Sequence, residues 1–194
     1  MKKLLAALLV AAVPLTAGDF KSLKIGDAAP TFSLKNYDGK DYALPQLLKD
    51  NKLVVVMFIA TRCPVSNAYD DRMQKLQESY AKKGVAIVGI NSNIKELVSE
   101  IAEHSKSHGF TFPILKDENN KIADLYGAQV TPETYVIAPD GKIMYHGRID
   151  DSRNAEKVQT QDLAVALDAL LAGKAVSVAE TKAFGCSIKR TVAD

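Results

Sequence analysis

Two uninterrupted hydrophobic runs, residues 53–60 and 85–90, lie in the first half of the chain. Neither run alternates apolar with polar positions, which is typical of strands that are buried on both faces of a sheet. Between the runs, apolar residues recur at helical spacing from 64 to 83, with polar residues on the opposite face. This order of strand, helix and strand predicts a βαβ unit with two parallel strands.

Shorter elements are predicted on either side of this unit. Before it, residues 31–34 and 42–44 form a hairpin around the turn at Asp38, and a short helix covers 45–49. After it we expect a helix at 94–108 capped by Asn93, a strand at 112–115, a helix at 119–126, a hairpin of strands 133–138 and 143–147, and a helix at 161–171. Residues 174–194 show neither the helical nor the strand spacing of apolar residues. We therefore expect this tail to dock on the rest of the chain.

The first 18 residues have the pattern of a secretory signal peptide. A charged start, Met1-Lys2-Lys3, precedes a short apolar run that reaches small residues near Ala17. The run is too short to span a bilayer, and an uncleaved N-terminal anchor is the alternative. Cleavage predicts a periplasmic or secreted protein without stable membrane insertion. It leaves residues 19–194 as one domain that includes the docked tail 174–194.

The composition is that of an ordinary globular protein, with 47% hydrophobic and 25% charged residues. Removal of Lys2 and Lys3 with the signal peptide reduces 25 basic residues to 23, equal to the 23 acidic residues, so the mature chain is neutral. No basic stripe is interleaved with aromatic residues, and we therefore expect no nucleic-acid partner.

Cys63 stands where the first buried strand meets the predicted helix. Pro64 suits the first turn of a helix, because its missing N–H costs nothing there. A thiolate at a helix N-terminus is stabilised by unpaired N–H groups and the helix dipole, and Arg62 adds a cation. We expect a lowered pKa and a nucleophilic thiol at Cys63. A buried, inert cysteine is the alternative.

The second cysteine, Cys186, lies in the tail. Attack by Cys63 on a peroxide or a disulfide leaves a sulfenic acid or a mixed disulfide, and both need a second thiol for resolution. Ser66 occupies the place where a local dithiol motif would carry that thiol. Cys186 is therefore the candidate resolving cysteine. A permanent structural bridge and two independent thiols are the alternatives.

The three histidines are weaker candidates for a functional role than the two cysteines. His104 and His108 lie four residues apart on a predicted helix, as metal ligands can. Without a nearby carboxylate or thiol partner they predict no metal site, and we expect no cofactor. His146 is expected to be structural or exposed.

Five short motifs occur in order along the chain. They are Cys63-Pro64-Val65, Ile90-Asn91-Ser92-Asn93, Thr131-Pro132, the segment 147–153 and the segment 185–189. Together they resemble the AhpC/TSA (peroxiredoxin-like) proteins of the thioredoxin-like superfamily, and most closely the exported peroxiredoxin-like 1 subgroup. The resemblance covers roughly residues 23 to 190.

The resemblance implies an α/β thioredoxin fold, with a central mixed sheet flanked by helices, an N-terminal β-hairpin extension and an extended C-terminal tail. It also implies that Pro132 is cis and lies against Cys63, with the backbone of Thr131 free to pair with a substrate strand. An edge-strand proline is the alternative.

One position departs from the peroxiredoxin pattern, and the role of another, Arg148, has two interpretations. A peroxidatic threonine would stand three residues before the cysteine, where this chain has Ala60, and Thr61 stands two residues before Cys63. Arg148 is a candidate for stabilising the thiolate or orienting a peroxide oxygen through its fixed donors. The alternative is a surface arginine paired with one of the aspartates at 150 and 151.

The chain is thus predicted to be an exported thiol-based oxidoreductase that exchanges with protein or small-molecule disulfides. Cys63 is the nucleophile and Cys186 the resolving cysteine. One alternative is a peroxiredoxin-like peroxidase that reduces hydrogen peroxide or alkyl hydroperoxides. Another is a non-catalytic binding module in which a structural Cys63–Cys186 disulfide fixes the tail.

Overall fold

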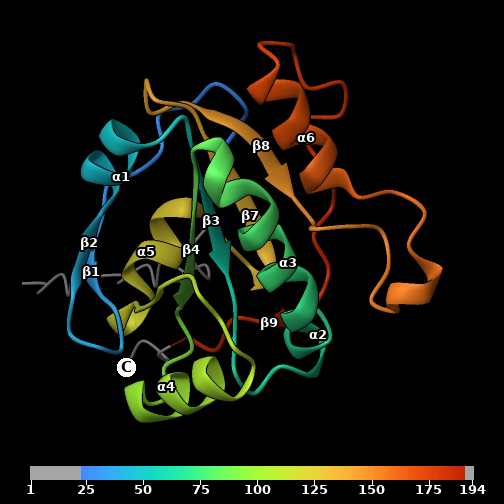
Figure 1. Ribbon diagram of the computed structural model, residues 1–194. Coiled ribbons are helices and arrows are strands. Elements are labelled where there is room, and N and C mark those ends of the chain that lie inside the picture. The colour runs from blue at the N-terminus through green and yellow to red at the C-terminus, as the bar shows by residue number, and fades with distance from the viewer. Residues whose placement is uncertain (1–22, 191–194) are drawn as a thin grey trace, which may run out of the picture.

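A five-stranded mixed sheet forms the centre of the computed structural model, which describes residues 23–190 (Figure 1). Its strand order is β5-β4-β3-β7-β8. The strands are β3 (Leu53–Phe58), β4 (Val85–Asn91), β5 (Ile114–Lys116), β7 (Glu133–Ile137) and β8 (Ile143–Gly147). β3 runs parallel to β4 and antiparallel to β7. This arrangement is the thioredoxin fold that the sequence resemblance implies. The expected signal peptide, 1–18, lies outside the described residues.

Strand β3 is buried on both faces, as its unbroken hydrophobic run predicts. One face packs against α3 (Asp70–Tyr80), α4 (Val98–Ser107) and α6 (Asp162–Leu171), and the other against α1 (Leu44–Asp50) and α5 (Lys121–Tyr126). The first face presents Leu53, Val55 and Met57, and the second presents Val54, Val56 and Phe58. Two apolar layers therefore fix the end of β3, from which Cys63 follows.

The helix predicted over 64–83 is interrupted. It consists of α2 (Pro64–Asn67), α3 and a 3₁₀ turn (Ala81–Lys83). At the break the amide of Tyr69 donates to the carbonyl of Ser66, a contact three residues apart that tightens the backbone. The guanidinium of Arg72 lies over the Tyr69 ring, 3.7 Å from its centroid. As a result Asp70, instead of lying inside a long helix, becomes the first residue of α3.

The prediction that Asn93 caps a helix beginning at 94 is wrong. Helix α4 begins at Val98, and the carboxylate of Glu100 accepts a hydrogen bond from the amide of its N-cap residue, Leu97. The Asn93 side chain is used elsewhere: its Nδ2 donates to Glu96, and its Oδ1 accepts from the amide of Lys189 in the tail. Residues 92–97 are consequently a loop that links the tail to the Cys63 region.

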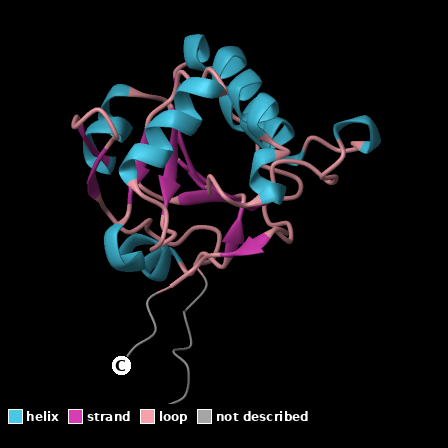
Figure 2. Cartoon of the chain, turned by 90° about the horizontal axis from the view of Figure 1, so that it is seen from below, coloured by secondary structure: helices cyan, strands magenta, loops and turns pink. Residues whose placement is uncertain are grey.

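The two predicted hairpins are confirmed. Strands β1 (Ser33–Lys35) and β2 (Asp41–Ala43) pair antiparallel before the sheet, and β7 pairs antiparallel with β8. Helix α5 follows a 3₁₀ turn (Glu118–Asn120). The connection between β8 and α6 projects from the body of the molecule and carries a 3₁₀ turn, Ala155–Lys157 (Figures 1 and 2). Among residues 23–190, no helix is both long and apolar enough to span a bilayer.

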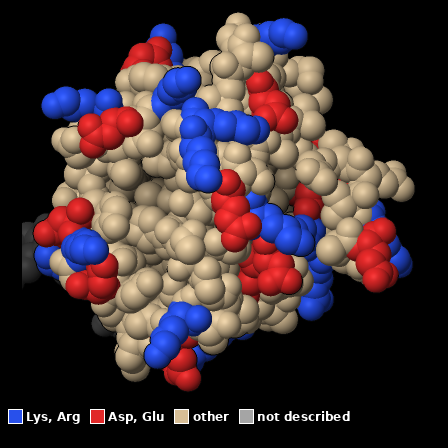
Figure 3. Space-filling view, in the orientation of Figure 1, with Lys and Arg blue, Asp and Glu red and all other residues tan. Residues whose placement is uncertain are grey.

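Charged side chains of both signs are interspersed on the face shown in Figure 3. Several basic side chains of the protein form ion pairs, such as Lys35 with Asp41 and Arg62 with Glu100. A group of basic side chains lies at the upper centre of this face, with acidic side chains next to it.

The tail docks on the fold, as expected. Strand β9 (Cys186–Ser187) pairs antiparallel with β6 (Val130–Thr131), which directly precedes Pro132. The amide of Ile188 donates to the carbonyl of Gln129 at 2.9 Å, and the Ile188 side chain is buried in the core beside α5. The part of the tail that carries Cys186 therefore lies beside the segment that leads into β7.

Candidate functional site

Cys63 is the N-cap residue of α2. Its Sγ accepts a hydrogen bond from the amide of Ser66 at 3.3 Å, and the Ser66 hydroxyl accepts from the amide of Ala60 at 3.2 Å. The predicted place of Cys63 at a helix start is therefore confirmed. Because α2 has only four residues, the Ser66 amide acts on the sulfur more directly than a helix dipole does.

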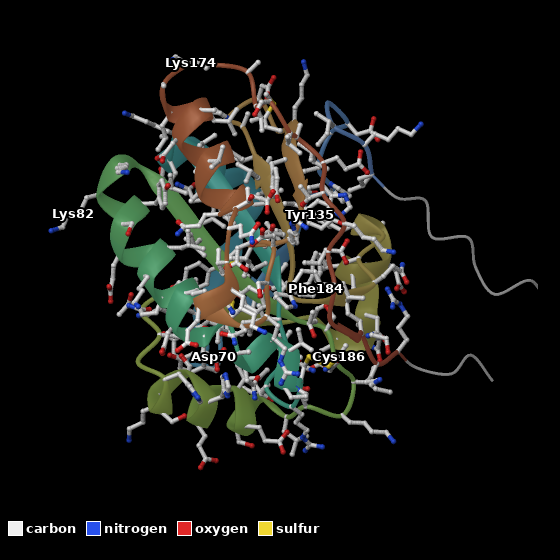
Figure 4. The ribbon with its side chains drawn as sticks, turned by 90° about the vertical axis from the view of Figure 1, so that its right-hand side faces the viewer. Asp70, Lys82, Tyr135, Lys174, Phe184 and Cys186 are labelled. Carbon is white, nitrogen blue, oxygen red and sulfur yellow. A yellow bond between two sulfur atoms is a disulfide. The ribbon has the colours of Figure 1, made fainter. Side chains whose placement is uncertain are left out.

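A disulfide joins Cys63 to Cys186 (Figure 4). The Cα atoms are 6.0 Å apart, within the usual range for a disulfide, and the sequence separation is 123. The interpretation of two independent thiols does not apply to this structure. Cys63 is only 3% exposed, whereas Cys186 is partly exposed. An external thiol therefore has easier access to the tail side of the bridge.

The Thr131–Pro132 peptide bond is cis, as the resemblance implies. The carbonyl oxygen of Thr131 lies 3.5 Å from Sγ of Cys63. The expectation that the Thr131 backbone is free to pair with a substrate strand is wrong for this structure, because Thr131 is paired with Cys186 of the tail. The position expected for a substrate is occupied by the chain itself.

Gly185 permits this close approach. A Cβ atom placed on Gly185 would lie 1.9 Å from the carbonyl oxygen of Thr131 and 3.3 Å from the nitrogen of Pro132. Neither atom belongs to a flexible side chain, so any larger residue at 185 would displace the tail strand. The glycine before Cys186 is thus a steric requirement of tail docking.

Glu96 supports the loop that leads to Cys63. Its buried carboxylate accepts hydrogen bonds from the amide and hydroxyl of Thr61 at 2.7 and 2.8 Å, the amide of Arg62 at 3.2 Å, and the side-chain amides of Asn91 at 2.6 Å and Asn93 at 2.7 Å. Burial raises the pKa of Glu96, but these hydrogen bonds outweigh it and leave the pKa below its ordinary value. The Thr61 hydroxyl is therefore occupied by Glu96.

Glu133 supports the strand on which the tail docks. Its carboxylate accepts from the amides of Gln129 and Val130 at 2.8 and 3.1 Å and lies 2.7 Å from Nε2 of His146. Burial raises the pKa of Glu133, but the His146 and backbone hydrogen bonds outweigh it, and the pKa lies below its ordinary value. His146 is thus structural, one of the two roles expected for it.

Arg148 is engaged by Asp162. Its Nε and Nη2 donate to the two carboxylate oxygens at 2.8 and 3.3 Å, a bidentate pair. The partner is neither of the two aspartates named in the alternative interpretation, and Asp150 pairs instead with Arg72 at 2.6 Å. Within residues 23–190 no hydrogen bond or ion pair joins Arg148 to Cys63.

Arg62 likewise faces a carboxylate instead of the sulfur. Its guanidinium is hydrogen-bonded to Glu100 of α4, and its side chain is largely exposed. The positive charge of Arg62, expected to stabilise the Cys63 thiolate, is therefore paired with the carboxylate of Glu100.

The docked tail has further contacts on both sides of Cys186. Before it, Phe184 packs edge-on against Tyr69, with ring centroids 6.4 Å apart. After it, the amide of Lys189 donates to the Asn93 side chain at 2.7 Å, and the Arg190 guanidinium donates to Asp124 at 2.8 Å. The bridge therefore lies within a continuous docked segment.

Sequence reasoning identified Cys63, Cys186, Thr131 and Pro132, and the structure brings these four together. It did not identify Glu96 and Glu133, which act through backbone amides. No signal marked Glu96, which falls inside a segment predicted to be helical. Glu133 follows Pro132 directly, which is the one signal that could have indicated it.

Known proteins that are similar in sequence or fold indicate the family of the chain. The AhpC/TSA family profile matches residues 25–146. The chain is 37% identical over 142 residues to the thiol-disulfide oxidoreductase ResA of Oceanobacillus iheyensis, covering 72% of this chain and 73% of the relative. A hypothetical protein from Sinorhizobium meliloti 1021 superposes with a TM-score of 0.82 at 32% identity, over 89% of this chain and 98% of that one. A putative thiol:disulfide interchange protein, DsbE, from Chlorobium tepidum superposes with a TM-score of 0.58 at 25% identity, over 64% and 85%.

Proposed function

The chain belongs to the AhpC/TSA family and is an oxidoreductase, and we propose that it exchanges thiols and disulfides with Cys63 as nucleophile and Cys186 as resolving cysteine. The observation that carries this proposal is the Cys63–Cys186 bridge, which joins a thiol at a helix start to a strand docked beside the cis-proline. The ResA relative supports the same chemistry.

The proposed cycle begins with the reduced protein. The Cys63 thiolate attacks one sulfur of a substrate disulfide, the substrate S–S bond breaks, and the other substrate sulfur leaves as a thiolate. The Cys186 thiolate then attacks the Cys63 sulfur in the mixed disulfide. This step releases the second substrate thiolate and forms the Cys63–Cys186 bridge, so that two electrons pass from the protein to the substrate.

Reduction of the bridge is proposed to begin at Cys186, because Cys63 is only 3% exposed and Cys186 is partly exposed. A thiolate of the reductant attacks the Cys186 sulfur, and Cys63 leaves as a thiolate that the Ser66 amide stabilises. A second thiol of the reductant then attacks its own sulfur in the mixed disulfide and releases Cys186. The reductant ends as a disulfide.

A peroxidase has less support. The threonine hydroxyl expected to activate a peroxide is missing at Ala60, and the hydroxyl of Thr61 donates to Glu96 at 2.8 Å. A binding module with a permanent bridge differs from both enzymes, because its function would not require the bridge to open.

Export is proposed together with this chemistry. The pattern at residues 1–18 supports a signal peptide, and a disulfide is more easily maintained outside the cytoplasm. N-terminal sequencing of the protein recovered from a periplasmic extract tests this: cleavage near Ala17 supports export, and an intact Met1 in the cytoplasmic fraction contradicts it.

Exchange is tested by mixing reduced protein with a model disulfide and following mixed disulfides by mass spectrometry. Wild type is expected to end bridged, Cys63→Ser to be inactive, and Cys186→Ser to accumulate a mixed disulfide at Cys63. Full activity of Cys63→Ser would reject the proposal. In parallel, peroxide oxidation much faster than that of free cysteine would favour the peroxidase. If both reactions fail and the bridge resists a strong reductant in the folded state, the binding module remains.

A further inference from the structure

Three potential metal ligands converge where α3 begins and α4 ends. Folding brings Asp70, the first residue of α3, to both His104 and His108. Figure 4 shows Asp70 at the junction of the two helices. We propose that Asp70, His104 and His108 bind a divalent transition-metal ion of the zinc type, at a site that uses neither cysteine.

The separations fit such an ion. Oδ2 of Asp70 lies 3.2 Å from Nε2 of His104 and 3.5 Å from Nε2 of His108, and the three ligand atoms are all within 4.8 Å of one another. Zinc bonds of about 2.0–2.2 Å in a tetrahedron place neighbouring ligand atoms about 3.3 Å apart. The two measured carboxylate–imidazole separations bracket that value, so each histidine has the spacing from Asp70 of two ligands that share one ion.

Oδ2 of Asp70 has no partner other than the two histidines among residues 23–190. Asp70 is 3% exposed, and its Oδ2 is buried without a hydrogen bond from any residue in the described part of the chain. A buried carboxylate oxygen without a hydrogen-bond donor is costly unless a cation lies beside it. The two imidazole rings stack 4.1 Å apart with both Nε2 atoms near Oδ2 of Asp70, and a metal ion held by these three atoms would supply that cation.

The surroundings orient His108 as a ligand. Its Nδ1 lies 2.9 Å from the carbonyl oxygen of His104 and 3.0 Å from the Ser107 hydroxyl, so the nitrogen that faces Asp70 and would bind an ion is Nε2. The Phe110 ring packs beside both imidazoles, at 5.8 Å from His104 and 6.1 Å from His108. The side chain of His108 is 39% exposed, which gives an ion access from solvent and leaves room for a water ligand.

Ligand chemistry selects the class of ion. Two imidazoles and one carboxylate suit Zn²⁺ and its usual substitutes Co²⁺ and Ni²⁺, whereas Ca²⁺ and Mg²⁺ prefer oxygen ligands. Three protein ligands with an open fourth position predict an exchangeable ion. Because its ligands come from two helices, the ion would fasten the end of α4 to the start of α3 and stabilise the folded state by mass action.

The test uses the untagged, oxidised protein, in which the bridge keeps both thiols from binding metal. Zn²⁺ is titrated by calorimetry, and Co²⁺ is titrated by its visible absorption, which reports tetrahedral coordination. Wild type is expected to bind one equivalent and to melt at a higher temperature with Zn²⁺. Asp70→Asn and His108→Gln should each weaken binding by more than about tenfold, because even second-shell changes at metal sites cost about that much.

Asp71→Asn is the matched control, since Asp71 is the adjacent aspartate and is exposed. It should bind as wild type does. Binding of Zn²⁺ by wild type that is weaker than about 1 mM would show an aspartate–histidine ion pair only and would overturn the proposal. Binding that survives both ligand substitutions would also overturn it, because the ion would then lie elsewhere. If Asp70→Asn fails to fold by circular dichroism, the exposed His108→Gln still decides the outcome.

Discussion

Thr131 faces Cys186 across the short antiparallel pair of β6 and β9, while its carbonyl oxygen lies 3.5 Å from Sγ of Cys63. One residue beside the cis-proline therefore contacts both ends of the bridge. Extended peptides commonly bind by adding a strand to a free backbone edge. In the oxidised chain that edge is filled by residues 186 and 187, so a peptide substrate can pair with Thr131 only after the tail strand has left.

Reduction should therefore loosen the tail. The amide of Ile188, which donates to Gln129, is expected to exchange its hydrogen faster in the reduced protein, because the bridge no longer holds β9 on β6. Hydrogen exchange followed by mass spectrometry measures this, and the buried amides of β3 serve as the internal control. Equal protection of the 186–188 segment in both redox states would show that its other contacts suffice to hold the tail.

Gly185→Ala should weaken the bridge without touching either sulfur. The new methyl group would clash with the Thr131 carbonyl oxygen and displace β9. In a glutathione buffer the equilibrium constant for bridge formation is expected to fall by at least about tenfold, which corresponds to about 30 mV in reduction potential.

Lys182→Ala is the control for this change, since Lys182 is an exposed residue of the same tail. An unchanged potential in Gly185→Ala, measured by trapping thiols over a series of buffers, would contradict a steric role for the glycine.

Glu96 should make stability depend on pH. Its folded pKa lies below 4.5, so its contribution is fully present above pH 4.5 and is lost as the pH falls through the folded pKa. Glu96→Gln is expected to cost about 1–3 kcal/mol at pH 7, because charged hydrogen bonds to the Thr61–Arg62 backbone are lost. The cost should shrink towards pH 3.

Urea unfolding of wild type and Glu96→Gln across this pH range measures the effect. Glu103→Gln, at an exposed position of α4, controls for a general loss of charge. If the free energies of unfolding of wild type and of Glu96→Gln differ by the same amount at every pH, the prediction is contradicted. Such a result would mean that the charge of Glu96 does not contribute to stability.

Glu133→Gln should slow closure of the bridge. The amides of Gln129 and Val130 would lose a charged acceptor, and β6 would present a less ordered edge to the tail. After one equivalent of a model disulfide, the mixed disulfide at Cys63 is expected to persist longer than in wild type, as quenched-flow mass spectrometry can show. The exposed Glu180→Gln is the control. If the mixed disulfide decays at the same rate in Glu133→Gln and in wild type, Glu133 has no effect on the attack by Cys186.

The parts of the fold that the sequence predicts well are those set by nearby residues. The unbroken run of β3 and the proline after Cys63 specify a buried strand followed by a helix start, and both occur. The predicted helix at 94 fails because Glu96 binds the backbone 34 and 35 positions earlier, a contact that no local periodicity reveals.

The same limit applies to the sites. The tail strand has two residues and pairs with a segment of two residues, too short for any alternating pattern. The cluster of Asp70 with His104 and His108 joins helices that are far apart in the chain, and it depends on a break after Asn67 that the continuous helical spacing concealed. Contacts of this kind are set by packing of the whole molecule.

The Cys63–Cys186 bridge also closes a covalent ring, and the projecting segment with the exposed residues Arg153 and Lys157 lies inside it. A protease that cleaves one peptide bond there would divide the chain into two pieces, one with the five-stranded sheet and one with α6 and the tail. The Cys63–Cys186 bridge would still join the two pieces covalently. The oxidised molecule would remain one species, heavier by one water. The reduced molecule would be two fragments held only by noncovalent contacts. The redox state of this one disulfide therefore decides whether a cleaved chain stays covalently joined.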